Sequence, residues 1–237
     1  MEQQISDRIA VVDWAALQAA LDENGFAVTP SLLTPKQCRE LIALYGEEAA
    51  FRSRVIMQRH AFGRGEYQYF RYALPEPVQQ LRESLYPQLA PVAQGWAERL
   101  GEETKFPPNL KAYLTRCHAA GQKRPTPLLL KYGAGDYNCL HQDLYGEQVF
   151  PLQATILLSD AQQNFDGGEF MLVEQRPRQQ SKGEVVPLQQ GQAVIFAVNS
   201  RPVKGSRGYY RAKLRHGVSR IRSGNRFTLG IIFHDAM

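Results

Sequence analysis

The chain has 237 residues, of which 43% are hydrophobic and 22% are charged. This composition is that of a globular protein with a sizeable core, and it excludes fibrous and intrinsically disordered proteins. No stretch approaches the ~18 consecutive apolar residues of a membrane span, and the opening MEQQISDRIAVVDW lacks the features of a signal peptide. Cys38, Cys117 and Cys139 fit neither a disulfide framework nor a zinc site, so we expect reduced thiols in a cytoplasmic protein.

Positive charge is concentrated in one part of the chain. Residues 176–226 contain twelve Lys or Arg residues and one acid, Glu184, so this segment carries +11 while the whole chain carries +5. The remainder is correspondingly acidic, at −6. Such an uneven distribution favours an anionic partner such as nucleic acid, and the alternative is a solvated basic face.

The N-terminal part is predicted to be largely helical. Residues 13–24 have apolar side chains at helical spacing and are followed by Gly25, which is a helix stop. After a short strand at 26–28, Thr34 and Gln37 form a capping box that begins a second helix.

Residues 51–75 are rich in Arg and aromatic side chains but have no helical period, and we interpret them as strands and a loop. A third helix is predicted over residues 76–100, where Pro87 and Pro91 are expected to break or kink it.

From about residue 128 the pattern changes to short β-like runs separated by glycine-rich turns. Five strands are predicted, at residues 128–132, 153–158, 169–173, 193–198 and 226–233. The pattern favours a mostly β core buttressed by N-terminal helices. We expect residues 1–110 to pack as a helical region on a core formed by residues 111–237, in one structural unit.

A metal site is indicated by His141 and Asp143. Side chains two residues apart in an extended strand point to the same face, so both can reach one ion. His216, just before the last predicted strand, is a candidate third ligand. Two histidines and one carboxylate are the ligand set of non-haem Fe(II) oxygenases, because they leave positions of the iron open. The alternative is that His141 and Asp143 are hydrogen-bonded in a turn and that His216 lies on the surface.

The other histidines, His60, His118 and His234, are not expected to bind metal. Cys139 lies two residues before His141, and a buried packing role is the favoured interpretation, with a thiol beside the metal as the alternative.

The last predicted strand alternates between an apolar face and a face with Arg226, Thr228 and Gly230. A lone arginine facing the inside of a β core is costly unless it is paired. A dicarboxylate ligand would supply the partner, since guanidinium binds carboxylate through two hydrogen bonds and the Thr228 hydroxyl can add a third. The alternative is a salt bridge to an acid of the protein.

These features together resemble the 2-oxoglutarate/Fe(II) oxygenase superfamily, and more narrowly the bacterial Oxygenase-NA family in its prolyl-hydroxylase-like branch. The segments that carry the narrower resemblance are LHQDLYGEQVFPLQATILLSD, FDGGEFMLVEQRPRQQS, FAVNSRPVKGSRGYYR and LRHGVSRIRSGNRFTLGIIFHDA. The resemblance implies a double-stranded β-helix (jelly-roll) core and a dioxygenase that uses Fe(II), 2-oxoglutarate and O2. It implies iron ligation by His141, Asp143 and His216, and cosubstrate binding by Arg226, with Tyr132 nearby.

The resemblance also implies oxidative demethylation of damaged nucleic-acid bases. We expect Arg207, Tyr209, Tyr210 and Arg211 to bind such a substrate, single-stranded or damaged, through phosphate contacts and base stacking. The Arg- and aromatic-rich residues 51–72 are a second candidate surface. The alternatives are a protein or prolyl hydroxylase, a small-molecule hydroxylase, and a jelly-roll metal-binding sensor without turnover.

Overall fold

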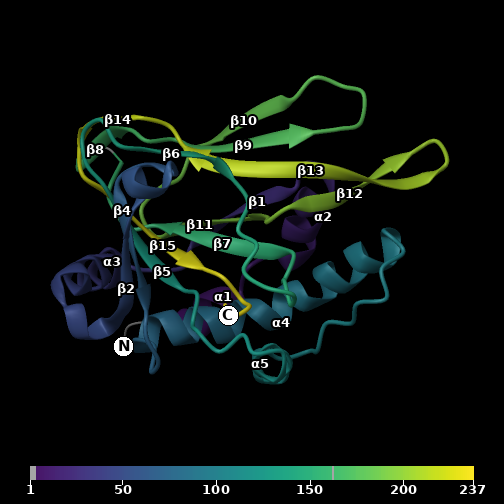
Figure 1. The fold of residues 1–237 in the computed structure, drawn as a ribbon, viewed down its shortest axis with the longest axis horizontal. Coiled ribbons are helices and arrows are strands. Elements are labelled where there is room, and N and C mark those ends of the chain that lie inside the picture. Colours follow the sequence, from purple (N-terminus) through teal and green to yellow (C-terminus); the bar gives the residue numbers. More distant parts are fainter. Residues whose placement is uncertain (1–3, 162) are drawn as a thin grey trace.

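The computed structural model describes residues 4–161 and 163–237, so the first three residues of the opening stretch lie outside the described part. Two β-sheets face each other, and helices cover the outer side of the larger sheet (Figure 1). None of the described helices is long and apolar enough to cross a membrane. The mostly β jelly-roll core with N-terminal helices is therefore confirmed.

Five α-helices are described: α1 (Ile5–Ala10), α2 (Trp14–Asn24), α3 (Pro35–Ala43), α4 (Glu76–Arg99) and α5 (Leu110–Ala119). Short 3-10 turns occupy Leu44–Gly46, Glu48–Ala50 and Met57–His60. The capping box predicted for α3 is present, since the Thr34 side chain accepts from Gln37 N and the Gln37 side chain accepts from Thr34 N.

Pro87 and Pro91 were predicted to break or kink this helix, and α4 is not broken at either residue. The helix is continuous from Glu76 to Arg99, and both prolines lie on its exposed side. Their spacing of four residues places them on one face, where water can satisfy the carbonyls that lose an amide partner. The opposite face buries Leu85, Leu89 and other apolar side chains, which holds the helix against the sheet.

The larger sheet is formed by seven strands in the order β1-β11-β7-β15-β5-β4-β2. Their bounds are Phe26–Ser31 (β1), Gln192–Ala197 (β11), Leu152–Leu157 (β7), Arg226–Ile231 (β15), Leu128–Tyr132 (β5), Glu66–Phe70 (β4) and Phe51–Ile56 (β2). Three of these strands, β1, β2 and β4, precede residue 110. The division of the chain at residues 110 and 111 stays a prediction.

The smaller sheet has the order β10-β9-β13-β6-β3, with β12 also paired to β13. Its strands are Lys182–Val186 (β10), Phe170–Gln175 (β9), Gly208–Val218 (β13), Tyr137–His141 (β6), Gly63–Arg64 (β3) and Ser200–Gly205 (β12). A separate pair is formed by β8 (Phe165–Gly167) and β14 (Ile221–Gly224).

The five predicted strands are confirmed as β5, β7, β9, β11 and β15, with ends that shift by at most two residues. Sequence patterns missed β13, whose outward side chains Lys213 and Arg215 are exposed while its inward side chains are buried at every second position. A strand with such a basic outer face reads as a loop when only hydrophobic content is considered.

The alternation predicted for β15 is confirmed, and the two faces of this strand point into different parts of the molecule. Leu229, Ile231 and Phe233 belong to the main hydrophobic core, which they share with α4 and its neighbours. Arg226, Thr228 and Gly230 instead line a cavity between the two sheets. The larger sheet thus places apolar side chains toward the helices and polar ones toward the smaller sheet.

A buried ion pair fastens α4 to the segment that follows β15. Arg82 Nη2 lies 2.8 Å from Asp235 Oδ1, and both side chains are almost completely buried. Arg82 also donates to the carbonyls of Ile232 and Phe233, at 2.9 and 3.0 Å. Asp235 Oδ2 accepts from Tyr72 OH at 2.9 Å, so both charged groups have partners on all sides.

Replacing Arg82 with Met should lower the free energy of unfolding by about 3–5 kcal/mol, because Asp235 would remain buried without its arginine partner. Urea denaturation measures this change. The matched control is Lys36→Met, which removes an exposed pair with Glu40 and should cost less than about 0.5 kcal/mol. Equal losses of unfolding free energy in the two variants would contradict the larger contribution assigned to the buried pair.

Candidate metal centre

The pairing of β6 with β13 places two histidines side by side. His141 is the last residue of β6, and its cross-strand partner on β13 is His216. Their ring centroids are 4.2 Å apart. His216 is buried, so the alternative of a surface residue is excluded.

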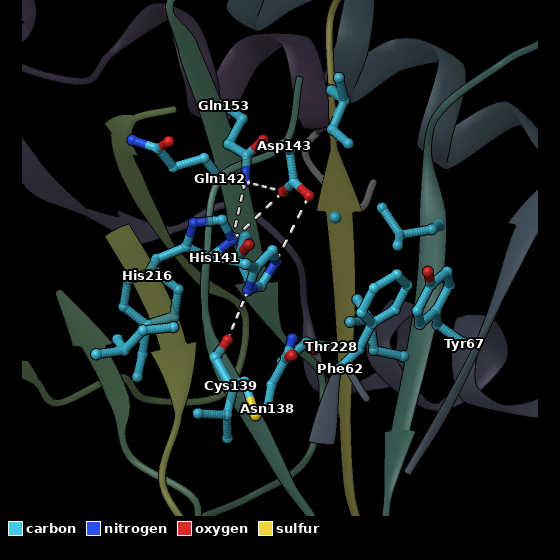
Figure 2. A pocket seen from close by; sticks show the side chains of 18 of the residues that line it. Phe62, Tyr67, Asn138, Cys139, His141, Gln142, Asp143, Gln153, His216 and Thr228 are labelled. Carbon is cyan, nitrogen blue, oxygen red and sulfur yellow. Dashed lines mark hydrogen bonds and ion pairs between the residues drawn. The ribbon is translucent and has the colours of Figure 1, made fainter. Parts of the chain in front are cut away.

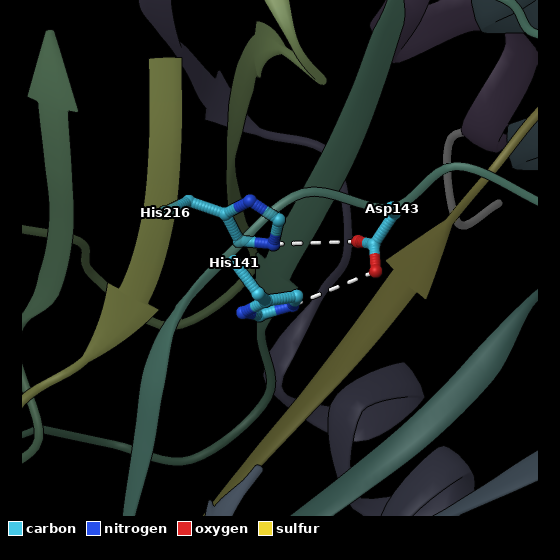
Figure 3. A group of neighbouring side chains, drawn as sticks. All are labelled: His141, Asp143 and His216. Carbon is cyan, nitrogen blue, oxygen red and sulfur yellow. Dashed lines mark ion pairs between the residues drawn. The ribbon is translucent and has the colours of Figure 1, made fainter. Parts of the chain in front are cut away.

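Asp143 lies just after β6 and completes the cluster (Figure 3). Its Oδ1 lies 3.5 Å from His141 Nε2, and its Oδ2 lies 3.3 Å from His216 Nε2. The three candidate ligand atoms all lie within 4.8 Å of one another, a geometry that can hold a metal ion. Gln142 points away, and its Nε2 donates to the Leu214 carbonyl at 2.7 Å, which ties this segment to β13.

The hydrogen bonds of the cluster favour the ionised form of Asp143. Burial opposes ionisation of Asp143, but hydrogen bonds from His141 and His216 outweigh it and hold the Asp143 pKa well below its usual range. Burial lowers the pKa of His216, whereas for His141 the hydrogen bond and charge of Asp143 outweigh burial and raise the pKa. The His141 Nδ1 donates to the Cys139 carbonyl at 2.8 Å, which orients the ring with Nε2 toward Asp143.

The cluster opens into a cavity of about 340 Å³. Arg226 lines this cavity and is 2% exposed, and its Nη1 has no hydrogen-bond partner among the described residues. No acid in the described chain lies within ion-pair distance of Arg226, so the alternative of a salt bridge is excluded there. Burial lowers the pKa of Arg226 to about 10, which keeps it charged at neutral pH.

Two further predicted residues lie beside Arg226. Tyr132 is its cross-strand partner on β5, and the guanidinium carbon lies 5.8 Å from the Tyr132 ring centroid. Thr228 is buried two residues along β15 and lines the same cavity. An unpaired cation, a phenol and a hydroxyl therefore share one wall of the cavity that the metal cluster enters.

Residues 65–236 match the model of the Oxygenase-NA family, described as an oxygenase catalysing oxidative methylation of damaged DNA. The match covers more than half of the chain and includes the three residues of the His–Asp–His cluster. The chain belongs to the Oxygenase-NA family. Two uncharacterized proteins of Mycobacterium tuberculosis, from strains CDC 1551 and H37Rv, are each 53% identical to it over 163 residues, which is 69% of this chain and 70% of theirs.

The fold is similar to that of a Pseudomonas putida prolyl-4-hydroxylase, with a TM-score of 0.55 and 16% identity over 92% of this chain and 96% of that one. It is also similar to a 2OG-Fe(II) oxygenase family oxidoreductase from Burkholderia pseudomallei, with a TM-score of 0.51 and 15% identity over 94% and 91% of the two chains. This Oxygenase-NA protein is therefore a 2-oxoglutarate-dependent dioxygenase that uses Fe(II), 2-oxoglutarate and O2.

The remaining histidines lie apart from the cluster of this Oxygenase-NA chain. His60 stacks on Phe62 in an exposed turn, His118 contacts Asp235, and His234 is buried with its Nδ1 accepting from Phe150 N. The buried role expected for Cys139 is wrong, because its side chain is exposed and lines the metal cavity. It reaches the cavity because β6 lies near the open edge of the smaller sheet, where only the short β3 covers it.

Several cations of the basic segment 176–226 are buried or paired with acids of the protein. Arg201 is buried and donates from Nε to Glu174 Oε2 at 2.6 Å. Arg211 donates to Glu102 at 2.6 Å, and Arg222 donates to Asp166 at 2.7 Å. Arg207, Tyr209, Tyr210 and Arg211 lie in the hairpin of β12 and β13 and do not line the metal cavity.

Two residues of the site were missed by sequence analysis. Gln153 on β7 donates to Asp143 Oδ2 at 2.8 Å, and Tyr145 donates to Asp143 Oδ1 at 2.6 Å (Figure 2 shows Gln153). Gln153 could have been found as the polar residue inside the apolar run PLQATILL. The signal for Tyr145 is weaker: it continues the two-residue spacing of His141 and Asp143.

Replacing His141, Asp143 or His216 with Ala should each remove specific binding of Mn(II), used as a stable substitute for Fe(II), because two remaining ligands do not form a site. Isothermal titration calorimetry measures the binding, and circular dichroism checks the fold. His118→Ala is the matched control and should bind Mn(II) as the wild type does. Retained high-affinity binding in His216→Ala would show that another residue supplies the third ligand.

Proposed function

We propose that this protein hydroxylates methyl groups on damaged nucleic-acid bases, with Fe(II) bound by His141, Asp143 and His216. When bound, the iron activates O2 while 2-oxoglutarate is converted to succinate and CO2. Hydroxylation of an N-methyl carbon gives a hemiaminal, which releases formaldehyde and leaves the unmethylated base. The description of the family, which names damaged DNA, supports this choice of substrate.

The cosubstrate assignment rests on the buried guanidinium of Arg226 in the cavity beside the cluster, whose Nη1 has no hydrogen-bond partner among the described residues. An unpaired charge inside a protein is costly, so the fold has a position that a ligand carboxylate completes. In this proposal Arg226 binds the distal carboxylate of 2-oxoglutarate, Thr228 adds a hydrogen bond, and Tyr132 borders the same ligand. The cosubstrate is thereby oriented with its other end toward the metal, and water is excluded from the charged pair.

Arg226→Ala should weaken 2-oxoglutarate binding by about 2–5 kcal/mol, because the ligand carboxylate would be desolvated without a partner. Arg226→Lys should recover part of this loss, since one charge remains but the two-pronged hydrogen bonding does not. Calorimetric titration of 2-oxoglutarate into the Mn(II)-loaded protein measures both. Unchanged affinity in Arg226→Ala would place the carboxylate elsewhere.

Aromatic and apolar side chains at the cavity support a planar substrate. Phe62 is 48% exposed, lies at the cavity and is stacked on His60 with centroids 5.3 Å apart. Leu140, also at the cavity, is 40% exposed. An exposed aromatic ring of this kind can stack on a base that has been removed from its helix.

The hairpin of β12 and β13 supports contacts with the flanking strand of the nucleic acid. Lys204 and Arg207 are exposed near its tip, and no ion-pair partner is described for either. Arg207 lies nine residues from His216 along the chain, which is roughly 30 Å in extended strand. At 3.4 Å per nucleotide of one strand in a duplex, this corresponds to roughly nine nucleotides from the reacting base.

The function is tested with Fe(II), 2-oxoglutarate and N-methylated single-stranded oligonucleotides of ~20 and ~2 nucleotides, lengths that do and do not span the distance to the hairpin. Wild type should release equal amounts of succinate and formaldehyde with both. The double variant Lys204→Ala/Arg207→Ala should raise the KM for the longer oligonucleotide only, with a loss of salt dependence of up to about 1.4 in the log–log slope.

The matched control is Lys36→Ala/Lys105→Ala, which removes the same charge from the helical side of the molecule. A proline-containing peptide and a methylated free nucleoside complete the panel. Turnover of the peptide alone would overturn the nucleic-acid proposal and leave the dioxygenase chemistry standing.

A further inference from the structure

Both oxygens of Asp143 receive a hydrogen bond from an uncharged side chain outside the histidine pair. Tyr145 OH donates to Oδ1 at 2.6 Å, and Gln153 Nε2 donates to Oδ2 at 2.8 Å. An ionised carboxylate has about four acceptor positions, so each oxygen keeps a lone pair for a metal. The two donors therefore fix the plane of the carboxylate without consuming its ability to bind an ion.

The Tyr145 ring belongs to a row of three tyrosine rings. It meets the ring of Tyr69 edge-to-face at 6.3 Å, and Tyr69 meets Tyr67 in the same way at 5.4 Å. Since an ionised carboxylate can only accept, the Tyr145 hydroxyl is the donor in its hydrogen bond with Asp143. The edge-to-face contacts hold the Tyr145 ring in place, and its hydroxyl with it.

The backbone that carries Tyr145 is held by Gln122, which is fully buried. Gln122 Nε2 donates to the carbonyls of Tyr145 and Gln148 at 3.2 and 3.0 Å, and its Oε1 accepts from Gln148 N at 2.7 Å. Gly146 has a φ of +114°, and a Cβ there would lie 2.6 Å from Gln122 Cδ. The turn therefore closes tightly around Gln122, and the position of Tyr145 does not depend on the metal ligands themselves.

We propose that Tyr145 is a positioning residue that presents Asp143 to the metal, with Gln153 as its counterpart on the other oxygen. The inference rests on the assignment of Asp143 as a ligand in the proposed function. Without the Tyr145 hydroxyl, Asp143 loses the donor on Oδ1, so its carboxylate rotates more freely and its binding to an ion weakens. Loss of a hydrogen bond to a metal-ligating side chain generally lowers the affinity of the site for the metal.

The test compares Tyr145→Phe with Tyr67→Phe, which removes the same hydroxyl from the far end of the row of tyrosine rings. Tyr145→Phe should bind Mn(II) about 10–100-fold more weakly than wild type, the range found when a partner of a metal ligand is removed. Tyr67→Phe should bind Mn(II) as the wild type does. Gln153→Leu, which removes the donor on Oδ2, provides a second variant and should also bind Mn(II) more weakly.

The visible absorption of bound Co(II) gives a readout that a purely structural role would not move. Tyr145→Phe should change this spectrum while the metal-free protein unfolds at the same urea concentration as Tyr67→Phe. Wild-type Mn(II) affinity in Tyr145→Phe, or an equal loss in both Phe variants, would overturn the positioning role. A different result would contradict the proposed function, namely wild-type Mn(II) affinity in Asp143→Ala.

Discussion

The site depends on the register between β6 and β13. Because His141 and His216 are direct cross-strand partners, their rings lie on the same face of the smaller sheet and meet in the space between the sheets. A slip of one residue would turn one of the rings to the outer face. Gln142, between the two β6-side ligands, bonds back to the Leu214 carbonyl on β13 and opposes such a slip. Asp143 then needs only to follow β6 to complete the cluster.

The same space contains a second, electrostatic constraint. Arg226 places a buried charge in the cavity wall, and no acid of the described chain lies within ion-pair distance of it. By contrast, Arg82 and Arg201 are equally buried and both have carboxylate partners, Asp235 and Glu174. Of these three buried arginines, Arg226 alone lacks a carboxylate partner among the described residues. Local rules of stability are broken where a ligand is needed, which is a common property of functional sites.

The chemistry of the site was more predictable than its surroundings. Residue type and the two-residue spacing identified His141 and Asp143, although Asp143 lies just after the end of β6. Strict alternation along β15 identified the inward face of Arg226 and Thr228, because this alternation depends only on strand geometry. Pairing between distant segments leaves no such local signal. The neighbour of His216 across the sheet, the turn built on Gln122 and the burial of Arg201 depend on contacts between residues far apart in the chain. Counting charges along 176–226 therefore overestimated the basic surface.

The buried fork of Arg201 has a mechanical consequence for the hairpin that it begins. Its Nε is bound to Glu174 on β9 and its Nη1 to the carbonyl of Asp22 at the end of α2, so the base of the hairpin is fastened to two layers of the molecule. The base of the hairpin is therefore held in place, while Lys204 and Arg207 near its tip stay exposed. In the proposed complex with nucleic acid, a hairpin with a fixed base has less conformational entropy to lose than one with a mobile base. Arg201, which lies outside the proposed contact surface, would in this way affect the affinity of the tip.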